Sequence, residues 1–250
     1  MKEEIAKANY KFHFVSDLHL GSDSEPNFLL FLNYLESLPQ KKVTHLFLLG
    51  DIFDLWVADQ KFFIQKYQSI VNEIKSLVER GVEVHYFEGN HDFHLKKYWQ
   101  DEVGVYIYEE PQRLQIANVN LLLAHGDQID QEDIGYLRLR KFFRSGFAKF
   151  VAFYLPGVIT RKLGAFADKK STGHYVRSEE QKKRLIGLIR NFAQVSYEQM
   201  PYNYCLTGHV HIKDEYSVNE NAKSINLGTW LDEPSFYQID PESSQFFKVP

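Results

Sequence analysis

The chain has 250 residues, 44% of them hydrophobic, which suffices for one large core or two small ones. The formal net charge of −4 excludes a general electrostatic attraction to nucleic acid, so we expect no nucleic-acid partner. The single cysteine excludes an intramolecular disulfide and fits a reducing, cytoplasmic compartment, and we expect this thiol, Cys205, to be buried.

No targeting or membrane-spanning segment is evident. Residues 1–9 are charged and lack the apolar core of a signal peptide. The most apolar stretch, Phe147–Ile159, contains Lys149 and Pro156 and is too short to cross a bilayer as a helix. These features predict a soluble or membrane-peripheral protein.

Five hydrophobic segments are predicted to form buried strands, and polar residues follow each of them. The segments are Phe12–Val15, His45–Leu49, Val82–Phe87, Val119–Ala124 and Tyr204–Thr207. They lead into the motifs Asp17-Leu18-His19, Gly50-Asp51-Ile52-Phe53-Asp54, Gly89-Asn90-His91-Asp92, His125-Gly126-Asp127 and Gly208-His209-Val210-His211. Strands of α/β folds build their sites at their carboxyl ends. Five such ends in series predict a dinuclear metal centre.

Two helices are predicted between the first three strands. Apolar residues recur at helical spacing from Phe28 to Leu38, directly before Pro39. A second helix is predicted from about Lys61 to Arg80, with Gly81 as its natural end. The pattern of strand, helix and strand favours an α/β class.

Further elements are predicted toward the carboxyl terminus. Residues 112–124 indicate a hairpin that turns at Asn118. A capping box at residues 178–181 opens a helix that extends to about Val195. The last predicted strand pair consists of Ser224–Leu227 and Ser235–Ile239.

Residues from about 128 to 173 interrupt this pattern and are predicted to be an insertion in a single domain spanning residues 1–250. After Asp133 the segment is strongly basic, with Arg and Lys interleaved among Phe, Leu and Tyr. This composition suits a ligand that is both anionic and apolar. A basic helical hairpin packed on its own domain is the alternative. The interleaving is unlike a groove that follows a nucleic-acid backbone.

The ligand types indicate which ions and which chemistry to expect. Asp, His and Asn without thiolates suit two divalent ions, for which we expect Mn²⁺, with Fe²⁺ or Zn²⁺ as alternatives. Two cations close together need a shared carboxylate, and Asp51 is central in the series. Their remaining charge would bind a phosphate and lower the pKa of a bridging water. This predicts hydrolysis by attack of a metal-bridging hydroxide on phosphorus.

The ordered motifs resemble the calcineurin-like metallophosphoesterase superfamily, whose pattern is DxH, GDxxD, GNH[DE], a later His and GHxH. All of them are present between residues 17 and 211. The resemblance implies a four-layer αββα sandwich in the α/β (α+β) class. It implies that one ion is held by Asp17, His19 and His211, the other by Asn90, His125 and His209, with Asp51 as the bridge. It further implies that His91 is a catalytic acid beside the phosphate, oriented by Asp54.

Other polar residues near the motifs have structural alternatives. Asp54 could serve only to pair with His91, while Asp92 and Asp127 could serve hydrogen bonds within loops. His94 and His174 lie near motifs and are weaker candidates for contact with substrate.

The insertion resembles the lid of UDP-2,3-diacylglucosamine hydrolases. The matching residues are Asp133, Tyr136, Arg138 and Arg140 at its start, and Lys169, Lys170 and Ser171 at its end. This resemblance implies a helical lid that binds substrate and a role in lipid A biosynthesis. It implies cleavage of UDP-2,3-diacylglucosamine into UMP and 2,3-diacylglucosamine 1-phosphate. It also implies peripheral contact with lipid of the inner membrane, and it leaves the oligomeric state open.

One position departs from that hydrolase family, whose well-known members carry Arg where this chain has His91. Arg grips a diphosphate through two hydrogen bonds, whereas His offers a smaller contact that can titrate. A soluble nucleotide or nucleotide-sugar phosphoesterase with the same centre is therefore the second hypothesis. A non-enzymatic scaffold of this fold would have lost metal ligands, but all seven are present here.

Overall fold

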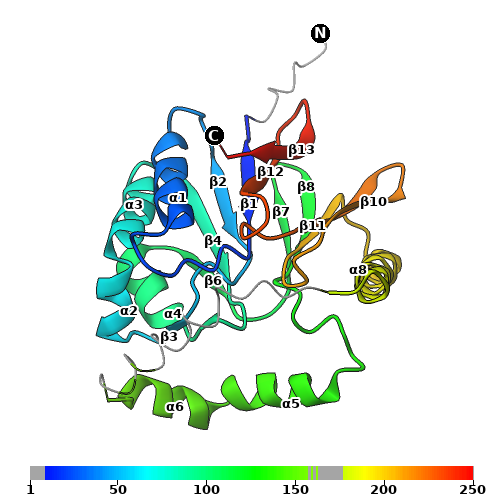
Figure 1. Ribbon diagram of the computed structural model, residues 1–250. Coiled ribbons are helices and arrows are strands. Elements are labelled where there is room, and N and C mark those ends of the chain that lie inside the picture. Colours follow the sequence, from blue (N-terminus) through cyan, green and yellow to red (C-terminus); the bar gives the residue numbers. More distant parts are fainter. Residues whose placement is uncertain (1–8, 157–158, 160–161, 163–176, 250) are drawn as a thin grey trace.

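A computed structural model describes residues 9–156, 159, 162 and 177–249. Two sheets pack face to face, with helices on their outer faces (Figure 1). The sandwich architecture that the family resemblance implied is therefore confirmed. Within the described ranges, none of the helices is long and apolar enough to span a membrane.

The first sheet has six strands and is mostly parallel. Its order is β13 (Ser244–Lys248), β12 (Ser235–Ile239), β1 (Phe12–Val15), β2 (His45–Leu48), β4 (Glu83–Phe87) and β6 (Tyr106–Tyr108). Strands β1, β2, β4 and β6 run parallel to one another, so their carboxyl ends meet at one edge. Three of the metal-binding motifs begin at that edge.

The second sheet has five strands. Its order is β10 (Lys213–Asn219), β11 (Ala222–Leu227), β9 (Tyr204–Thr207), β8 (Val119–Leu123) and β7 (Gln112–Ile116). Strands β8, β9 and β11 are parallel. The two remaining motifs follow β8 and β9, so both sheets contribute to one site.

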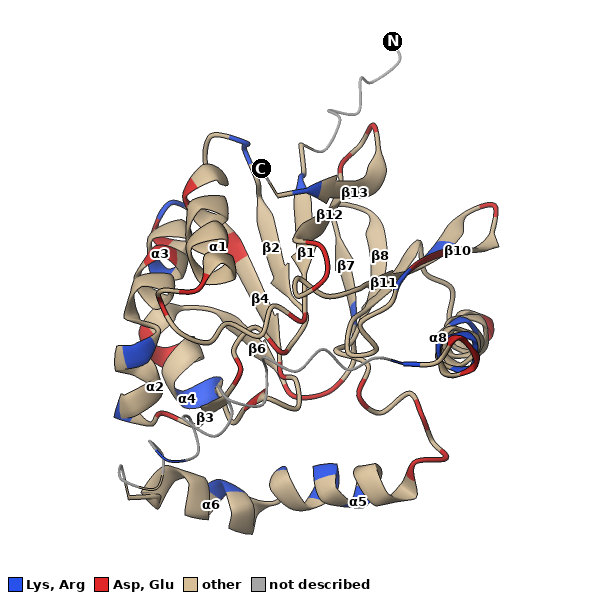
Figure 2. Cartoon of the chain, in the orientation of Figure 1, with Lys and Arg blue, Asp and Glu red and all other residues tan. Residues whose placement is uncertain are grey.

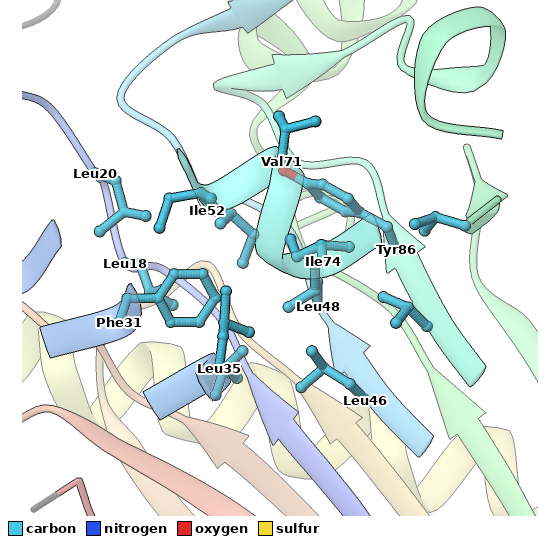
Figure 3. Packing of buried hydrophobic residues seen from close by; sticks show 14 of the residues in the cluster. Leu18, Leu20, Phe31, Leu35, Leu46, Leu48, Ile52, Val71, Ile74 and Tyr86 are labelled. Carbon is cyan, nitrogen blue, oxygen red and sulfur yellow. The ribbon is translucent and has the colours of Figure 1, made fainter. Parts of the chain in front are cut away.

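The central strands β1 and β2 of the first sheet are mostly apolar because both of their faces are buried. Leu46 and Leu48 of β2 face helices α1 (Pro26–Ser37) and α3 (Gln68–Glu79), as Figure 3 shows. Phe47 lies between them in sequence and belongs to the core between the two sheets. The core between the sheets holds the carboxyl ends of the strands at fixed positions, and the site depends on those positions.

The remaining helices cover the outer faces and the site edge. Three short helical elements lie on the side of the first sheet: α2 (Lys61–Lys66), α4 (Lys96–Tyr98) and the π-helix Trp99–Val103. A short two-stranded sheet, β3 (Trp56–Val57) with β5 (Asp92–Phe93), joins two motif loops. Helix α8 (Glu179–Gln199) covers the second sheet, where Cys205 is buried. Helices α5 (Ile134–Phe143) and α6 (Gly146–Tyr154) lie beneath the carboxyl ends of the strands (Figure 1).

The predicted helix from Lys61 to Arg80 is wrong as a single element, because it is interrupted at Tyr67. The backbone there adopts φ −109° and ψ 21°. The buried Tyr67 ring packs against Phe53, and its hydroxyl donates to the carbonyl of Leu20 at 3.0 Å. Tertiary packing of one aromatic side chain overrides the helical pattern here.

The predicted pairing of the last two strands is also wrong. Both strands exist, but β11 pairs with β9 and β10, whereas β12 pairs with β1 and β13. The connection between them crosses from one sheet to the other, and Trp230 in this connection packs on Phe31. Strands β10 and β13 lie outside the predicted elements, and α8 extends beyond Val195.

Candidate metal centre

The seven predicted ligands gather at the carboxyl ends of strands from both sheets. Three of them, Asp17, His19 and His211, offer atoms that lie within 4.8 Å of one another. Asp51, His125 and His209 form a second such group. The structure therefore brings together the first ligand set that the resemblance implied, and it places Asp51 beside two members of the second.

The first group has the contacts expected around a cation. Nε2 of His19 lies 3.1 Å from Nε2 of His211, and Oδ1 of Asp17 lies 3.2 Å from the same His211 atom. Asp17 is fully buried, yet this oxygen accepts no hydrogen bond from any described residue. Two imidazole nitrogens and an unsatisfied carboxylate oxygen that converge in this way fit a divalent ion.

In the second group, a hydrogen bond to the main chain fixes the orientation of the His125 ring. The carbonyl of Leu49 accepts a hydrogen bond from Nδ1 of His125 at 2.8 Å. This bond leaves Nε2 of His125 as the atom that can bind a metal. It lies 3.2 Å from Oδ1 of Asn90 and 3.5 Å from Oδ2 of Asp51.

Asp51 lies between the two groups. Its Oδ2 atom is 3.5 Å from Nε2 of His125 and 3.9 Å from Nε2 of His19. Its other oxygen accepts a hydrogen bond from the backbone N–H of His91 at 2.9 Å. One carboxylate facing both groups has the placement that a bridging ligand needs.

The backbone at this site is strained. Five ligands have left-handed conformations, with φ of 54° at Asp17, 49° at His19, 53° at Asp51, 68° at His209 and 55° at His211. Such a conformation costs a non-glycine residue on the order of 1 kcal/mol. Backbone hydrogen bonds hold it, including the bond from the N–H of Asp17 to the carbonyl of Gly50 at 3.1 Å. This concentration of strain is typical of a functional site.

Two motif glycines are required by close packing against ligands. A Cβ atom at Gly50 would collide with the His125 ring, and Gly50 also has φ of +82°. A Cβ atom at Gly208 would collide with the Asp17 carboxylate. Because they lack a side chain, Gly50 and Gly208 allow their loops to lie directly against metal ligands that belong to other loops.

The electrostatic environment favours cations. Burial lowers the pKa of His125, but Asp51, Asp17 and Asp127 outweigh it and raise the pKa to about 9. Burial raises the pKa of Asp51, yet His125, His91 and His19 bring it below its usual value. Buried carboxylates that remain ionised create the negative potential that a pair of divalent ions would neutralise.

Comparison with known proteins agrees with this geometry. A family model described as calcineurin-like phosphoesterase matches residues 10–213. The chain belongs to the calcineurin-like phosphoesterase family. It is accordingly a metal-dependent hydrolase of phosphoric esters.

Several relatives match almost the whole chain. A UDP-2,3-diacylglucosamine hydrolase from Actinobacillus succinogenes is 26% identical and covers 95% of this chain and 99% of its own. One from Tolumonas auensis is 25% identical and covers 95% of this chain and 96% of its own. A solved structure of vacuolar protein sorting 29 from Cryptosporidium parvum covers 96% of each chain at 14% identity, with a TM-score of 0.45.

The orientation of His91 in this phosphoesterase differs from the sequence-based expectation. Its Nδ1 atom lies 2.7 Å from the backbone carbonyl of Asp54, which must accept the hydrogen bond. The Asp54 carboxylate instead approaches His19, with Oδ1 4.0 Å from Nδ1 of that ring. Asp54 therefore orients His91 through its main chain.

The predicted substrate residues of the phosphoesterase insertion have contacts of their own. Oδ2 of Asp127 accepts hydrogen bonds from the hydroxyl of Tyr136 at 2.9 Å and from Nε of Arg140 at 2.8 Å. The Tyr136 ring centroid is 6.0 Å from that of His209, beside the metal centre. Asp133 caps α5 by accepting from the N–H of Tyr136. Arg138 is exposed, and Lys169, Lys170 and Ser171 lie outside the described residues.

Two residues that support the site, Arg144 and Asp92, were missed or undervalued in the sequence. Arg144 donates to the carbonyls of Glu88 and Gly89 and forms a salt bridge with the buried Glu88 carboxylate at 2.9 Å. Asp92 accepts hydrogen bonds from the N–H groups of Asp51, Ile52 and Gly89 and from the Tyr86 hydroxyl. Arg144 belongs to no motif, so nothing in the sequence singled it out. Asp92 could have been recognised because it is the last residue of the GNH[DE] motif.

Proposed function

We propose that this enzyme hydrolyses the pyrophosphate bond of UDP-2,3-diacylglucosamine to give UMP and 2,3-diacylglucosamine 1-phosphate. The observation that carries the proposal is an apolar, basic pair of helices tied to the metal centre through Asp127. The printed names of the full-length relatives support the same substrate.

The chain's own residues would hold two divalent ions, for which Mn²⁺ is our expectation. The ligands would be Asp17, His19 and His211 for one, Asn90, His125 and His209 for the other, and Asp51 for both. When bound, the ions would supply Lewis acidity toward the phosphate oxygens and lower the pKa of a water molecule. Asp51 would keep the two positive charges close together.

His91 would assist at the phosphate. Its Nδ1–H is occupied by the carbonyl of Asp54, so only Nε2 can present a proton to an oxygen of the substrate. Burial lowers the pKa of His91, but Asp51 and the Asp54 carbonyl outweigh it, so the net direction is upward. A ring held in this way can stabilise a phosphoryl oxygen or protonate a leaving group.

The paired helices supply a surface for acyl chains. Phe147, Phe150 and Tyr154 are 70%, 63% and 73% exposed, which is unusual for large apolar side chains. Residues 134–154 contain Arg and Lys but no Asp or Glu (Figure 2). Burying hydrocarbon there would contribute about 0.8 kcal/mol per methylene, and the cations would face phosphate or anionic lipid. We extend the proposal to peripheral contact with the inner membrane.

Product analysis tests the proposal. The Mn²⁺-loaded enzyme should release UMP and a lipid 1-phosphate from UDP-2,3-diacylglucosamine. Replacing Phe147 and Phe150 with Ser should lower kcat/KM for this substrate at least tenfold while sparing bis(p-nitrophenyl) phosphate, which has no acyl chain. Phe143 is a poor choice for this test because its ring packs near Phe93.

The control is a pair of substitutions at exposed apolar residues that lie outside α5 and α6. Leu29 and Val195 are 52% and 42% exposed and lie on α1 and α8. Their replacement with Ser should leave both activities unchanged. Two results would favour the alternative, a soluble nucleotide-sugar phosphoesterase: equal loss of activity on both substrates in the Phe variants, or a preference of the wild type for UDP-sugars without acyl chains. The observation that supports this alternative is His91 in place of Arg.

A further inference from the structure

A second cluster of metal-binding side chains lies at the opposite edge of the first sheet from the catalytic centre. His45 begins β2, and Glu83 begins β4 beside it in parallel register. His85 is two residues further along β4 and therefore points to the same face as Glu83. Both imidazole rings lie near the ring of Phe47, which belongs to the core between the sheets. The cluster thus lies at the rim of that core.

The spacing of the three side chains fits one small cation. Nε2 of His45 is 3.6 Å from Oε1 of Glu83, and Nε2 of His85 is 3.9 Å from Oε2 of the same carboxylate. The potential ligand atoms all lie within 4.8 Å of one another. Two ligands at roughly 2.0–2.2 Å from a tetrahedral Zn²⁺ are about 3.3–3.5 Å apart. The Glu83 side chain is half-exposed, so its carboxylate can move to shorten its distances to both imidazoles.

The hydrogen bonds of His45 determine which ring nitrogen is available. The Thr44 hydroxyl donates its only hydrogen to the carbonyl of Lys11 at 3.1 Å. With that hydrogen in use, the hydroxyl can accept from Nδ1 of His45, which lies 2.9 Å away. A neutral His45 then directs the Nε2 lone pair toward a carboxylate, an arrangement that is repulsive unless a cation lies between them.

His85 supplies the second and independent observation. It is only 5% exposed, and its Nε2 atom has no hydrogen-bond partner among the residues that the structure describes. Nδ1 of the same ring lies 3.0 Å from the Tyr108 hydroxyl, and this hydrogen bond fixes the orientation of the ring. A metal-binding histidine needs this kind of support.

Both imidazoles are held in the form that binds metal. Burial, together with the neighbouring His45, lowers the pKa of His85 to about 4. Burial also lowers the pKa of His45, against an opposing contribution from Glu83. Neutral imidazole is the required ligand state, so no proton has to be displaced near neutral pH. A histidinium–carboxylate pair, the alternative explanation, is disfavoured by the same burial.

We propose that His45, Glu83 and His85 bind one first-row transition ion, such as Zn²⁺, separately from the two catalytic ions. Two nitrogens and one carboxylate oxygen leave a fourth position for water. The ion joins the amino ends of β2 and β4, and so it acts as a structural clamp far from the chemistry.

Zinc stoichiometry tests this site on the full chain. Wild-type protein, saturated with Zn²⁺ and dialysed against zinc-free buffer, should retain one more ion per chain than Glu83→Gln or His45→Ala. Activity on bis(p-nitrophenyl) phosphate should be equal in all three proteins, because none of the changed residues belongs to the catalytic centre. Glu36→Gln removes the same charge at an exposed position of α1 and should retain the wild-type number of ions.

Thermal unfolding provides a second readout. Zn²⁺ added to protein already saturated with Mn²⁺ should raise the unfolding temperature of the wild type and of Glu36→Gln more than that of Glu83→Gln. Equal zinc content in the wild type and Glu83→Gln would overturn the proposal. So would an extra ion that persists in both His45→Ala and Glu83→Gln, because that ion must be bound elsewhere.

Discussion

Asp92 shows how a single side chain can organise a metal centre without binding a metal. Its two oxygens accept from three backbone N–H groups and one hydroxyl, at 2.6 to 2.9 Å. Two of those N–H groups belong to Asp51 and Ile52, and the third belongs to Gly89. Asp92 therefore joins the loop of the bridging ligand to the loop of Asn90.

Asp92→Asn should reduce both metal content and stability. An amide presents an NH₂ group to donors that need an acceptor, so at least one buried N–H loses its partner, at about 1–3 kcal/mol. Metal analysis and denaturant unfolding measure the two effects. Asp101→Asn, at an exposed position, is the control. Full metal content in Asp92→Asn would show that the loops keep their positions without this carboxylate.

Asp54 should have a role of its own besides its main-chain contact with His91. The hydrogen bond from His91 goes to the Asp54 backbone, which survives a side-chain change, while the Asp54 carboxylate approaches His19. Asp54→Ala should therefore lower kcat/KM further when His91 is already alanine, and the two losses should add only in part, because His19 contacts both side chains. A double mutant no worse than His91→Ala would instead show that the carboxylate acts only through His91.

At the scale of elements, the motif-bearing strands could be predicted and their partners could not. Hydrophobic runs that end in Asp or His mark strand ends directly, because buried parallel strands are apolar on both faces. No local pattern tells that β11 and β12 join different sheets, since this depends on Trp230 packing on Phe31. For the same reason Arg144 escaped notice, as its partner Glu88 is distant in sequence.

Helix α5 should loosen when Arg140 is lost. Arg140→Ala would leave the buried Asp127 carboxylate without its cation, which costs about 3–5 kcal/mol, whereas Tyr136→Phe removes one hydrogen bond worth about 1 kcal/mol. Limited proteolysis within residues 134–154 should be markedly faster in Arg140→Ala. Arg138→Ala, exposed on the same helix, is the matched control. Equal cleavage rates in all three variants would mean that other contacts hold α5.

Strand β1 should contribute a pH dependence to stability through His13. Burial lowers the pKa of His13 to about 4, against an opposing hydrogen bond to the amide oxygen of Gln238, while the ordinary value is 6.5. Between these two values the unfolded chain binds more protons than the folded one, so stability falls as pH falls through this window. The full effect is up to about 3 kcal/mol. Denaturant unfolding at several pH values should show a shallower slope for His13→Gln than for the wild type, and identical slopes would contradict the assignment.

At the scale of the whole molecule, the metal centre joins the two sheets. Asp17, Asp51 and Asn90 follow strands of the first sheet, whereas His125 and His209 follow strands of the second. Ions bound by both sets would therefore resist separation of the sheets. The motifs predicted which strand ends carry the ligands, whereas only the structure shows which sheet each of these strands joins.

Removing the metals should lower the unfolding temperature of the wild type. An ion that binds only the folded chain stabilises it by an amount that grows with its concentration over its dissociation constant. Calorimetry with and without chelator measures the difference, and Asp51→Asn, with the bridging charge removed, should respond less. A chelator-treated wild type that retains both its unfolding temperature and its activity would rule out the metal centre.

The left-handed ligand residues have a consequence for the kinetics of metal exchange. Their backbone is held by hydrogen bonds within the protein, so the loops need no rearrangement when an ion arrives. Loading should then be limited by encounter and by the loss of water from the ion, and differences in affinity between metals should appear mainly as different residence times. The metal that the cell supplies most freely would occupy the site first, and the slowest to leave would remain.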